Sequence, residues 1–244
     1  MKTLTIIPSR LSATRLPGKP LLKINGLSII SHVYKQAMKA NIGDVVVAAE
    51  DQEIVDDIIS NGGRAILTSK RHKTGTDRIY EAFKKLETKD LDFIMNLQGD
   101  EPEVHIEDII NLNQKMIKSQ SKIGTLASNI QKDEDLKNKN IVKVITKQKI
   151  NENQFPEAKN FLRNSLKTEN IYHHIGVYCY STETLEEFVK LNQSENEIKN
   201  RLEQLRALDN KITINVANAK SSSIGVDTEE DYLALKKKME YKNK

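Results

Sequence analysis

Three basic side chains lie close together in a short loop near the start of the chain. The segment PSRLSATRLPGKP at residues 8–20 carries Arg10, Arg15 and Lys19 but no acidic residue. Arginine offers forked hydrogen-bond donors and lysine a compact positive charge, so this combination suits a polyphosphate ligand. The loop has neither the glycine spacing of a Walker A motif nor that of GxGxxG. A solvated basic loop is the alternative interpretation, and the residues alone leave both open.

A second candidate anion site is the segment TGTDR at 74–78, which begins a predicted helix. A helix N-terminus that contains Gly75 and nearby hydroxyls can bind an anion, and Arg78 would lie in its first turn. Plain N-capping of the helix by Thr74 or Thr76 explains the same residues. Capping is the interpretation that this segment favours when it is considered alone.

Two carboxylates follow glycines at the ends of strand-like segments. Asp100 lies in the motif QGDEP after a buried apolar run, and Asp227 lies in GVDT near the end of the chain. Mg²⁺ binds few protein carboxylates and completes its shell with substrate phosphates and water, so both positions suit it. Thr228 and Asp231 form a capping box, which leaves the Asp227 carboxylate free for a metal. Together with the basic loop, this pattern predicts metal-assisted phosphoryl chemistry, although a simple turn also explains Asp100.

The run IYHHIGVYCY at 171–180 predicts a strand whose side chains alternate between two faces. His174 and Tyr178 share one face, and Gly176 between them leaves room for a ligand. Cys179 falls on the other, mostly apolar face, where we expect a buried and unreactive thiol. No GxSxG or HExxH motif occurs, so the sequence gives no support for a hydrolase triad.

These candidates depend on an alternation of strands and helices in the first hundred residues. Strands are predicted at 3–7, 45–49, 64–68 and 92–98, and helices around 30–37, 51–60 and 76–86. We expect Pro8 to end the first strand. The alternation predicts an α/β fold with a doubly wound, mostly parallel, Rossmann-like sheet and right-handed crossovers. Such sheets bind ligands at the carboxyl ends of their strands, where the basic loop begins.

The middle of the chain changes character. Residues 121–180 combine three strand-like segments with polar stretches at 131–140 and 147–170, so we interpret them as an antiparallel arm with mobile loops. Helices at 183–191 and 196–209, a strand at 211–216 and a last helix from 228 follow. No repeat or low-complexity linker separates two full domains, so the chain is predicted to be a single domain over 1–244.

The composition excludes several classes of protein. Of the 244 residues, 38% are apolar and 30% charged, which allows a sizeable core and argues against disorder. A net charge of +4 is too mild to indicate nucleic-acid binding. The single cysteine excludes an internal disulfide framework. No apolar run near the start suits a signal peptide or a membrane span, so we expect a cytoplasmic protein that binds no membrane.

Several motifs occur in the order found in a known family. IIPSRLSATRLPGKPL, HKTGTDR, NLQGDEP, HHIGVY, LEQLRAL and GVDTEEDYLAL extend from residue 3 to about residue 239. The chain thereby resembles the 3-deoxy-manno-octulosonate (KDO) cytidylyltransferases, the CMP-KDO synthetases of Gram-negative bacteria. RLPGKPL and QGDEP are partly shared with sialate cytidylyltransferases and other sugar nucleotidyltransferases. HIGVY, LEQLRAL and GVDT are more specific to the KDO enzymes.

The resemblance implies a fold, a reaction and partners. The fold is that of the nucleotide-diphospho-sugar transferases, with a smaller sheet-and-loop arm used for dimerisation, so a homodimer is expected. The reaction is CTP + KDO → CMP-KDO + pyrophosphate, with Mg²⁺, in lipopolysaccharide biosynthesis. A sialate or other sugar nucleotidyltransferase of the same architecture is the alternative. A non-catalytic nucleotide-binding module would be expected to lack a metal carboxylate or the loop arginines, and all of these are present.

The resemblance also assigns residues to the two substrates. The nucleotide residues are Arg10, Arg15, Lys19, Thr74, Gly75, Arg78 and Gln98. The catalytic residues are Arg10, Arg15, Lys19, Asp100 and Asp227, of which the two aspartates bind the metal. The sugar residues are Gln98, Arg163, His174, Tyr178, Glu203 and Gln204. The chain reads NSLK after Arg163 where the family usually has Ile-Pro, so the sugar-side loop is expected to differ.

Overall fold

A computed structural model of the chain describes residues 1–12, 15–88, 90–220 and 225–241. These residues form two compact units. The first unit takes its residues from 2–91, 95–106 and 223–244, and the second from 92–94 and 107–222 together with Met1. The predicted arm at 121–180 therefore lies within the second unit, which extends beyond it on both sides. In the described part of the chain, no helix is long and apolar enough to cross a membrane.

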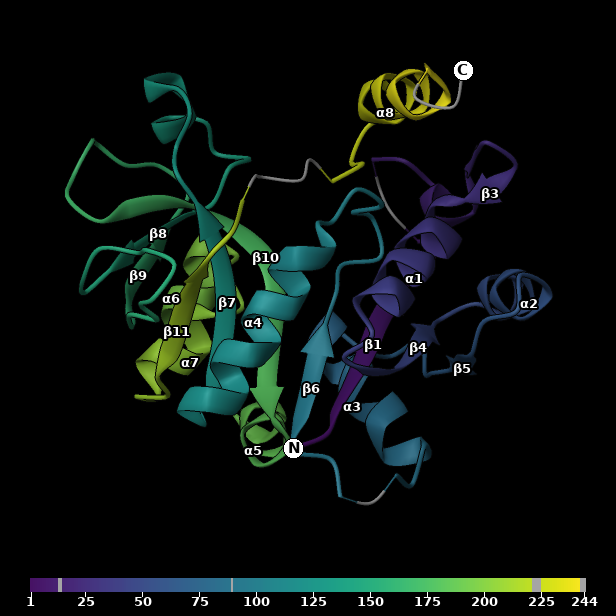
Figure 1. The fold of residues 1–244 in the computed structure, drawn as a ribbon, viewed down its shortest axis with the longest axis horizontal. Helices are drawn as coiled ribbons and strands as arrows, with labels where there is room; N and C mark the ends of the chain where they lie inside the picture. The colour runs from purple at the N-terminus through teal and green to yellow at the C-terminus, as the bar shows by residue number, and fades with distance from the viewer. Residues whose placement is uncertain (13–14, 89, 221–224, 242–244) are drawn as a thin grey trace. The chain divides into compact units, whose positions relative to one another are not determined.

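The first unit is a parallel sheet covered by helices. Its elements are β1 (Thr3–Ser9), a 3-10 turn (Lys19–Leu21), β2 (Lys23–Ile24), β3 (Leu27–Ser28), α1 (Ile29–Ala40), β4 (Gly43–Ala49), α2 (Gln52–Ser60), β5 (Ala65–Leu67), α3 (Gly75–Lys85), the end of β6 (Phe93–Asn96) and α8 (Glu229–Tyr241). The strand order is β6-β1-β4-β5, and β4 pairs in parallel with both β1 and β5. Figure 1 shows α1 and α2 on one side of β4 and β5, and α3 on the other. The predicted doubly wound parallel sheet is confirmed.

The elements of this unit follow from the hydrophobic pattern. Helix α1 buries Ile29, Ile30, Val33 and Ala37, and the hydroxyl of Ser28 caps it by accepting from the N–H of Ser31. Strand β4 is buried from residue 45 to residue 49, as expected for a strand with helices on both faces.

Pro8 lies inside β1, so the prediction that it ends the strand was wrong. The N–H of Glu50 donates to the carbonyl of Ser9, and the N–H of Leu97 donates to that of Ile6. Since successive residues of a strand point to alternate sides, the nitrogen of Pro8 points toward β6 rather than β4. Strand β6 ends at Asn96, so the N–H that proline lacks is not needed for the ladder.

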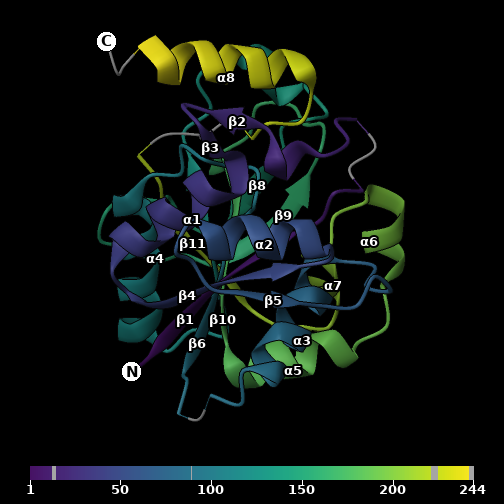
Figure 2. The ribbon, with the colours of Figure 1, turned by 90° about the vertical axis from the view of Figure 1, so that its right-hand side faces the viewer.

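The last helix packs on the β2–β3 hairpin. Ile24 and Ile29 form a buried apolar cluster with Val226 and Leu235, and the hydroxyl of Tyr232 donates to the carbonyl of residue 23 at 2.8 Å. Figure 2 shows α8 lying over β2 and β3. This cluster fixes the segment that carries Asp227.

The second unit is a mainly antiparallel sheet with helices. Its elements are the start of β6, α4 (Ile106–Ser119), β7 (Ile123–Ser128), a 3-10 turn (Asp133–Leu136), β8 (Lys143–Thr146), β9 (Ala158–Leu162), β10 (Ile171–Ser181), α5 (Thr182–Lys190), α6 (Glu195–Asn200), α7 (Leu205–Asp209) and β11 (Ile214–Asn218). Strand β7 lies between β10, antiparallel to it, and β11, parallel to it (Figure 1). Strand β8 pairs antiparallel with both β10 and β9. The predicted antiparallel character of this region is confirmed.

Two details of the second unit differ from the sequence-based expectation. Strand β9 lies in the stretch predicted to be a polar loop, because Lys159 and Asn160 are exposed and hide the strand pattern. The single helix predicted over 196–209 is two helices. Arg201 adopts a left-handed conformation with φ 53°, which ends α6 before α7 begins.

Candidate active site

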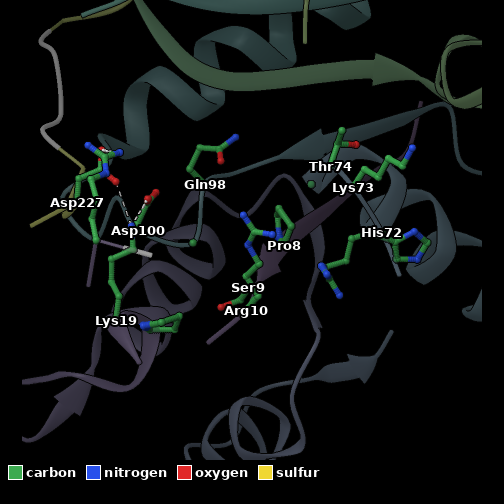
Figure 3. A pocket seen from close by; sticks show the side chains of 15 residues that line it. Pro8, Ser9, Arg10, Lys19, His72, Lys73, Thr74, Gln98, Asp100 and Asp227 are labelled. Atoms are coloured by element: carbon green, nitrogen blue, oxygen red, sulfur yellow. Dashed lines mark hydrogen bonds and ion pairs between the residues drawn. The ribbon is translucent and has the colours of Figure 1, made fainter. Parts of the chain in front are cut away.

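A cavity of about 340 Å³ lies in the first unit at the carboxyl ends of β1 and β6. Its walls include all seven predicted nucleotide residues and both predicted metal carboxylates: Arg10, Arg15, Lys19, Thr74, Gly75, Arg78, Gln98, Asp100 and Asp227. Figure 3 shows Lys19, Asp100 and Asp227 grouped at one end, with His72, Lys73 and Thr74 at the other. This is the edge of a parallel sheet where ligands are expected.

The basic loop is held by backbone contacts that leave its cations at the cavity. The N–H of Leu11 donates to Asp51 at 2.8 Å, and the N–H of Gly18 donates to the carbonyl of Leu11 at 3.1 Å. Gly18 adopts φ 72°, a left-handed conformation that favours glycine, and directs the chain into the 3-10 turn that carries Lys19. Residues 13 and 14 of this loop lie outside the described residues.

The two predicted metal carboxylates converge on one cation. The Nζ of Lys19 lies 2.7 Å from Asp100 Oδ2 and 3.3 Å from Asp227 Oδ1, and Arg15 Nη2 lies 2.9 Å from Asp227 Oδ2. The N–H of Val226 donates to the carbonyl of Asp100 at 2.9 Å, which fixes the two segments together. The ammonium group of Lys19 thus lies where a metal cation could bind between the two carboxylates. This arrangement fits Mg²⁺ with substrate phosphates as its further ligands.

The rest of the described chain offers no richer metal site. No group of three or more His, Cys, Asp or Glu side chains is placed to hold a metal among these residues. Two carboxylates leave most of the coordination positions to water or phosphate oxygens, which is the ligand set that Mg²⁺ commonly has.

Asp231 supports Asp227 from the first turn of α8. Its carboxylate accepts from the N–H groups of Asp227 at 3.1 Å and Thr228 at 2.9 Å, and its own N–H donates to the Thr228 hydroxyl at 3.2 Å. Burial alone would raise the pKa of Asp231, but these hydrogen bonds hold it below its usual value. The predicted capping box is confirmed, and the Asp227 side chain takes no part in it.

Gly99 is required where β6 approaches the end of β1. A Cβ at this position would lie 2.8 Å from the carbonyl oxygen of Pro8 and 3.1 Å from Ile30 Cδ1. Any larger residue would push Gln98 and Asp100 away from the basic loop.

Arg78 lines the cavity but also holds its wall together. Its guanidinium donates to Thr68 Oγ1 at 2.7 Å, to the carbonyl of Ser69 at 3.2 Å and to Glu50. The side chain is only 3% exposed. Thr74 caps α3 by accepting from the N–H of Asp77 at 3.2 Å, which confirms the capping interpretation of this segment.

His72 also lines the cavity and was not predicted as a site residue. Its Nε2 is hydrogen bonded to Glu81, which also accepts from the N–H of Ser69 at 2.9 Å and pairs with Lys85 at 2.7 Å. Burial alone would raise the pKa of Glu81, but these donors lower it to about 2. The signal in the sequence is weak, because Glu81 is nine residues from His72 and resembles any exposed helical acid.

Gln98 lines the cavity of the first unit, and the other predicted sugar residues lie in the second unit. The rings of His174 and Tyr178 are 5.5 Å apart, so the two side chains share a face of β10 as predicted. Further rings of Phe161, Tyr180 and Phe188 continue this row at centroid separations of 5.0 to 6.1 Å.

The environment of these groups is buried. Burial lowers the pKa of His174 to about 3, and the neighbouring His173 adds to the effect. Burial also raises the pKa of Tyr178 well above its usual value, with smaller contributions from Tyr180 and Glu203. Cys179 is fully buried as predicted, and burial raises the pKa of its thiol.

Glu203 and Gln204 lie in the turn between α6 and α7. Arg206 forms a buried two-pronged ion pair with Glu197, at 2.8 and 2.6 Å, and its Nη2 lies 3.7 Å from Glu203 Oε1. The same guanidinium stacks 4.7 Å from the centroid of the Phe188 ring. Arg206 therefore ties this turn to α6 and to the row of aromatic rings.

Arg163, the remaining predicted sugar residue, donates to three backbone carbonyls. Its nitrogens contact the carbonyl oxygens of Lys139, Asn200 and Arg201 at 2.9 to 3.1 Å. The fully buried Lys143 also donates to the carbonyl of Arg163, at 2.9 Å. In this arrangement Arg163 joins the loop before β8 to the end of α6.

Comparison with known protein families identifies relatives along nearly the whole chain. The family model described as cytidylyltransferase matches residues 4–214. A 3-deoxy-manno-octulosonate cytidylyltransferase of Thermodesulfovibrio yellowstonii is 40% identical, covering 95% of this chain and 95% of the relative. A protein of the same name from Rhodopseudomonas palustris is 40% identical, covering 94% of this chain and 94% of the relative. Another from Brucella canis is 39% identical, covering 95% of this chain and 93% of the relative.

Solved structures show the same architecture. A CMP:2-keto-3-deoxy-manno-octonic acid synthetase complexed with CTP superposes with a TM-score of 0.90 at 32% identity, covering 99% of this chain and 100% of the other. A cytidylyltransferase from Leptospira borgpetersenii superposes with a TM-score of 0.66 at 17% identity, covering 99% and 87%. The second likeness concerns the fold alone.

Proposed function

Because this chain belongs to the cytidylyltransferase family, we propose that it transfers the cytidylyl group of CTP to 3-deoxy-manno-octulosonate, releasing pyrophosphate. The observation that carries this proposal is the pair of carboxylates, Asp100 and Asp227, that converges on Lys19 in the cavity at the end of β1. The relatives named above supply the identity of the nucleotide and the sugar. A sialate-activating enzyme is not favoured, because those relatives carry KDO in their names.

The first unit binds the nucleotide in this proposal. Arg10, Arg15 and Lys19 face the cavity and offer charge-assisted hydrogen bonds to the triphosphate. Asp100 and Asp227 would hold Mg²⁺, which supplies charge neutralisation at the phosphates. Arg15 pairs with Asp227 and Lys19 with Asp100, so both cations lie beside the proposed position of the phosphates.

The second unit binds the sugar. His174, Tyr178, Glu203 and Gln204 supply hydrogen-bonding groups for KDO. The anomeric hydroxyl of the sugar attacks the α-phosphorus in line, the bond to the β-phosphate breaks, and pyrophosphate leaves. Because burial lowers the pKa of His174 to about 3, this side chain suits hydrogen bonding to the sugar better than accepting the hydroxyl proton at neutral pH.

The biological setting follows from the product. CMP-KDO serves lipopolysaccharide biosynthesis, so we propose that the protein acts in that process in the cytoplasm. We also propose that it works as a homodimer and that Mg²⁺ is its metal ion.

The proposed function is tested by measuring pyrophosphate release. The purified protein is assayed with each of the four nucleoside triphosphates, with and without KDO and Mg²⁺, and with sialate in place of KDO. We expect rapid release only when CTP, KDO and Mg²⁺ are all present. Equal release with sialate, or release that does not need a sugar, would refute the proposed substrate.

A further inference from the structure

Thr125 of β7 lies opposite an irregularity in β10. The register of the two strands shifts between Ile175 and Tyr178, so two residues of β10 have no direct partner on β7. The hydroxyl of Thr125 lies in this gap, 2.8 Å from the carbonyl oxygen of Val177 and 3.3 Å from that of Ile175. The same oxygen lies 3.0 Å from Nε2 of His174. Thr125 is fully buried, so no bulk water competes for these contacts.

Counting protons assigns the direction of each hydrogen bond. A threonine hydroxyl has one proton to donate and two lone pairs that accept. Both carbonyl oxygens can only accept, so the proton of Thr125 goes to them, mainly to Val177. The contact with His174 must then be donated by the Nε2–H of the imidazole.

The charge state of His174 completes the assignment. With its pKa near 3, the ring carries only one proton at neutral pH, and that proton is on Nε2. Nδ1 is therefore a bare acceptor. No hydrogen bond to Nδ1 is found among the residues that the structure describes. The ring contacts those of Phe161 and Tyr178, at centroid distances of 5.0 and 5.5 Å, and these contacts restrict its rotation.

We propose that Thr125 is a positioning residue that fixes His174 as its Nε2–H tautomer, so that Nδ1 accepts a hydrogen bond from a hydroxyl group of the sugar. This inference rests on the proposed function, in which His174 holds KDO. It also restricts which group of the sugar His174 can bind. A bare Nδ1 repels the sugar carboxylate, which has only lone pairs to offer, so the carboxylate must be bound by other groups.

The first test is nuclear magnetic resonance of protein labelled with ¹⁵N in histidine. In the wild type we expect the Nε2–H tautomer at His174, unchanged between pH 6 and pH 8. In Thr125→Val, which keeps the shape of the side chain but removes the hydroxyl, we expect a mixture of tautomers. Thr125→Ser restores the hydroxyl and should restore the wild-type spectrum. An Nδ1–H tautomer in the wild type would overturn the proposal even if Thr125→Val fails to fold.

The second test measures the effect on the sugar. Losing one neutral hydrogen bond predicts a KM for KDO that rises roughly two- to tenfold in Thr125→Val, with the KM for CTP unchanged and Thr125→Ser close to the wild type. One monodeoxy analogue of KDO should lack the hydroxyl that donates to Nδ1 of His174. We expect the wild type to bind this analogue more weakly than KDO, and Thr125→Val to bind the analogue and KDO equally well. An unchanged KM for KDO in Thr125→Val would overturn the proposal. If the wild type made no CMP-KDO, the proposed function would fail, whereas the tautomer measurement would still stand.

Discussion

Replacing Asp100 by asparagine should separate catalysis from stability in the carboxylate pair. Asp100 Oδ2 lies 2.7 Å from Lys19 Nζ, and its side chain is 31% exposed. A partly exposed ion pair contributes less than about 1 kcal/mol, and Lys19 keeps Asp227 as a partner at 3.3 Å. For a protein of this length, 1 kcal/mol corresponds to about 2–4 °C in Tm, so the melting temperature should fall by no more than that.

The effect on turnover should be far larger. A group that stabilises charge in the transition state contributes roughly 3–4 kcal/mol, so kcat should fall by about a hundred- to a thousandfold. The assay is pyrophosphate release across a range of Mg²⁺ concentrations, with Tm measured on the same samples. Glu103→Gln is the matched control, because it breaks a similar ion pair with Lys238 at 2.6 Å on a surface outside the cavity lining. A kcat of Asp100→Asn within tenfold of the wild type at saturating Mg²⁺ would refute the assignment.

Three further predictions concern the loop, the sugar face and pH. Arg15→Ala should raise the KM for CTP much more than that for KDO. Arg15→Lys should restore the KM for CTP only partly, because lysine lacks the paired N–H donors of the guanidinium. Equal changes in the KM for both substrates in steady-state assays would indicate a structural loop. Tyr178→Phe should raise the KM for KDO several-fold at unchanged Tm, since one neutral hydrogen bond contributes about 0.5–1.5 kcal/mol. Cys179→Ser should lower Tm and leave the KM for KDO unchanged, because it buries a hydroxyl. The reverse outcome would mean that the two faces of β10 are assigned the wrong way round. Because the pKa of His174 is near 3 in the folded state and about 6.5 when unfolded, only the unfolded chain gains this proton as the pH falls below 6.5. The contribution of His174 to the free energy of unfolding should therefore be full above pH 6.5 and fall by up to about 1.4 kcal/mol per pH unit below it. Urea unfolding between pH 6.5 and pH 5 measures this dependence in the wild type and in His174→Gln. If the free energy of unfolding had the same slope against pH in both proteins, this prediction would be contradicted.

The alternation of elements in the first unit could be predicted because β1, β4, α1 and α3 have clear apolar runs or helical spacing. The apolar run of β4 and the helical spacing of α1 each allow one interpretation. The failures have local causes. Pro8 could stay in β1 only because β6 ends beside it, and this depends on the pairing of another strand. The left-handed Arg201 divides one predicted helix into two, and arginine gives no sign of that conformation.

The candidate site could be predicted only where a motif carries it. The sequence places Asp100 and Asp227 at strand ends, but their convergence on Lys19 depends on contacts over 81 and 208 residues. Arg78 looks like a free cation in the sequence, and its burial against Glu50 appears only in the fold. Thr125 has no motif at all, because its role depends on the irregular register of the strand beside it.

The most direct test of the central claim is the identity of the product. The protein is incubated with CTP, KDO and Mg²⁺, and the reaction is followed by ³¹P nuclear magnetic resonance and mass spectrometry. We predict that CMP-KDO and pyrophosphate appear in equal amounts as CTP disappears. Pyrophosphate without a CMP-sugar, or a product that retains the β-phosphate of CTP, would contradict it.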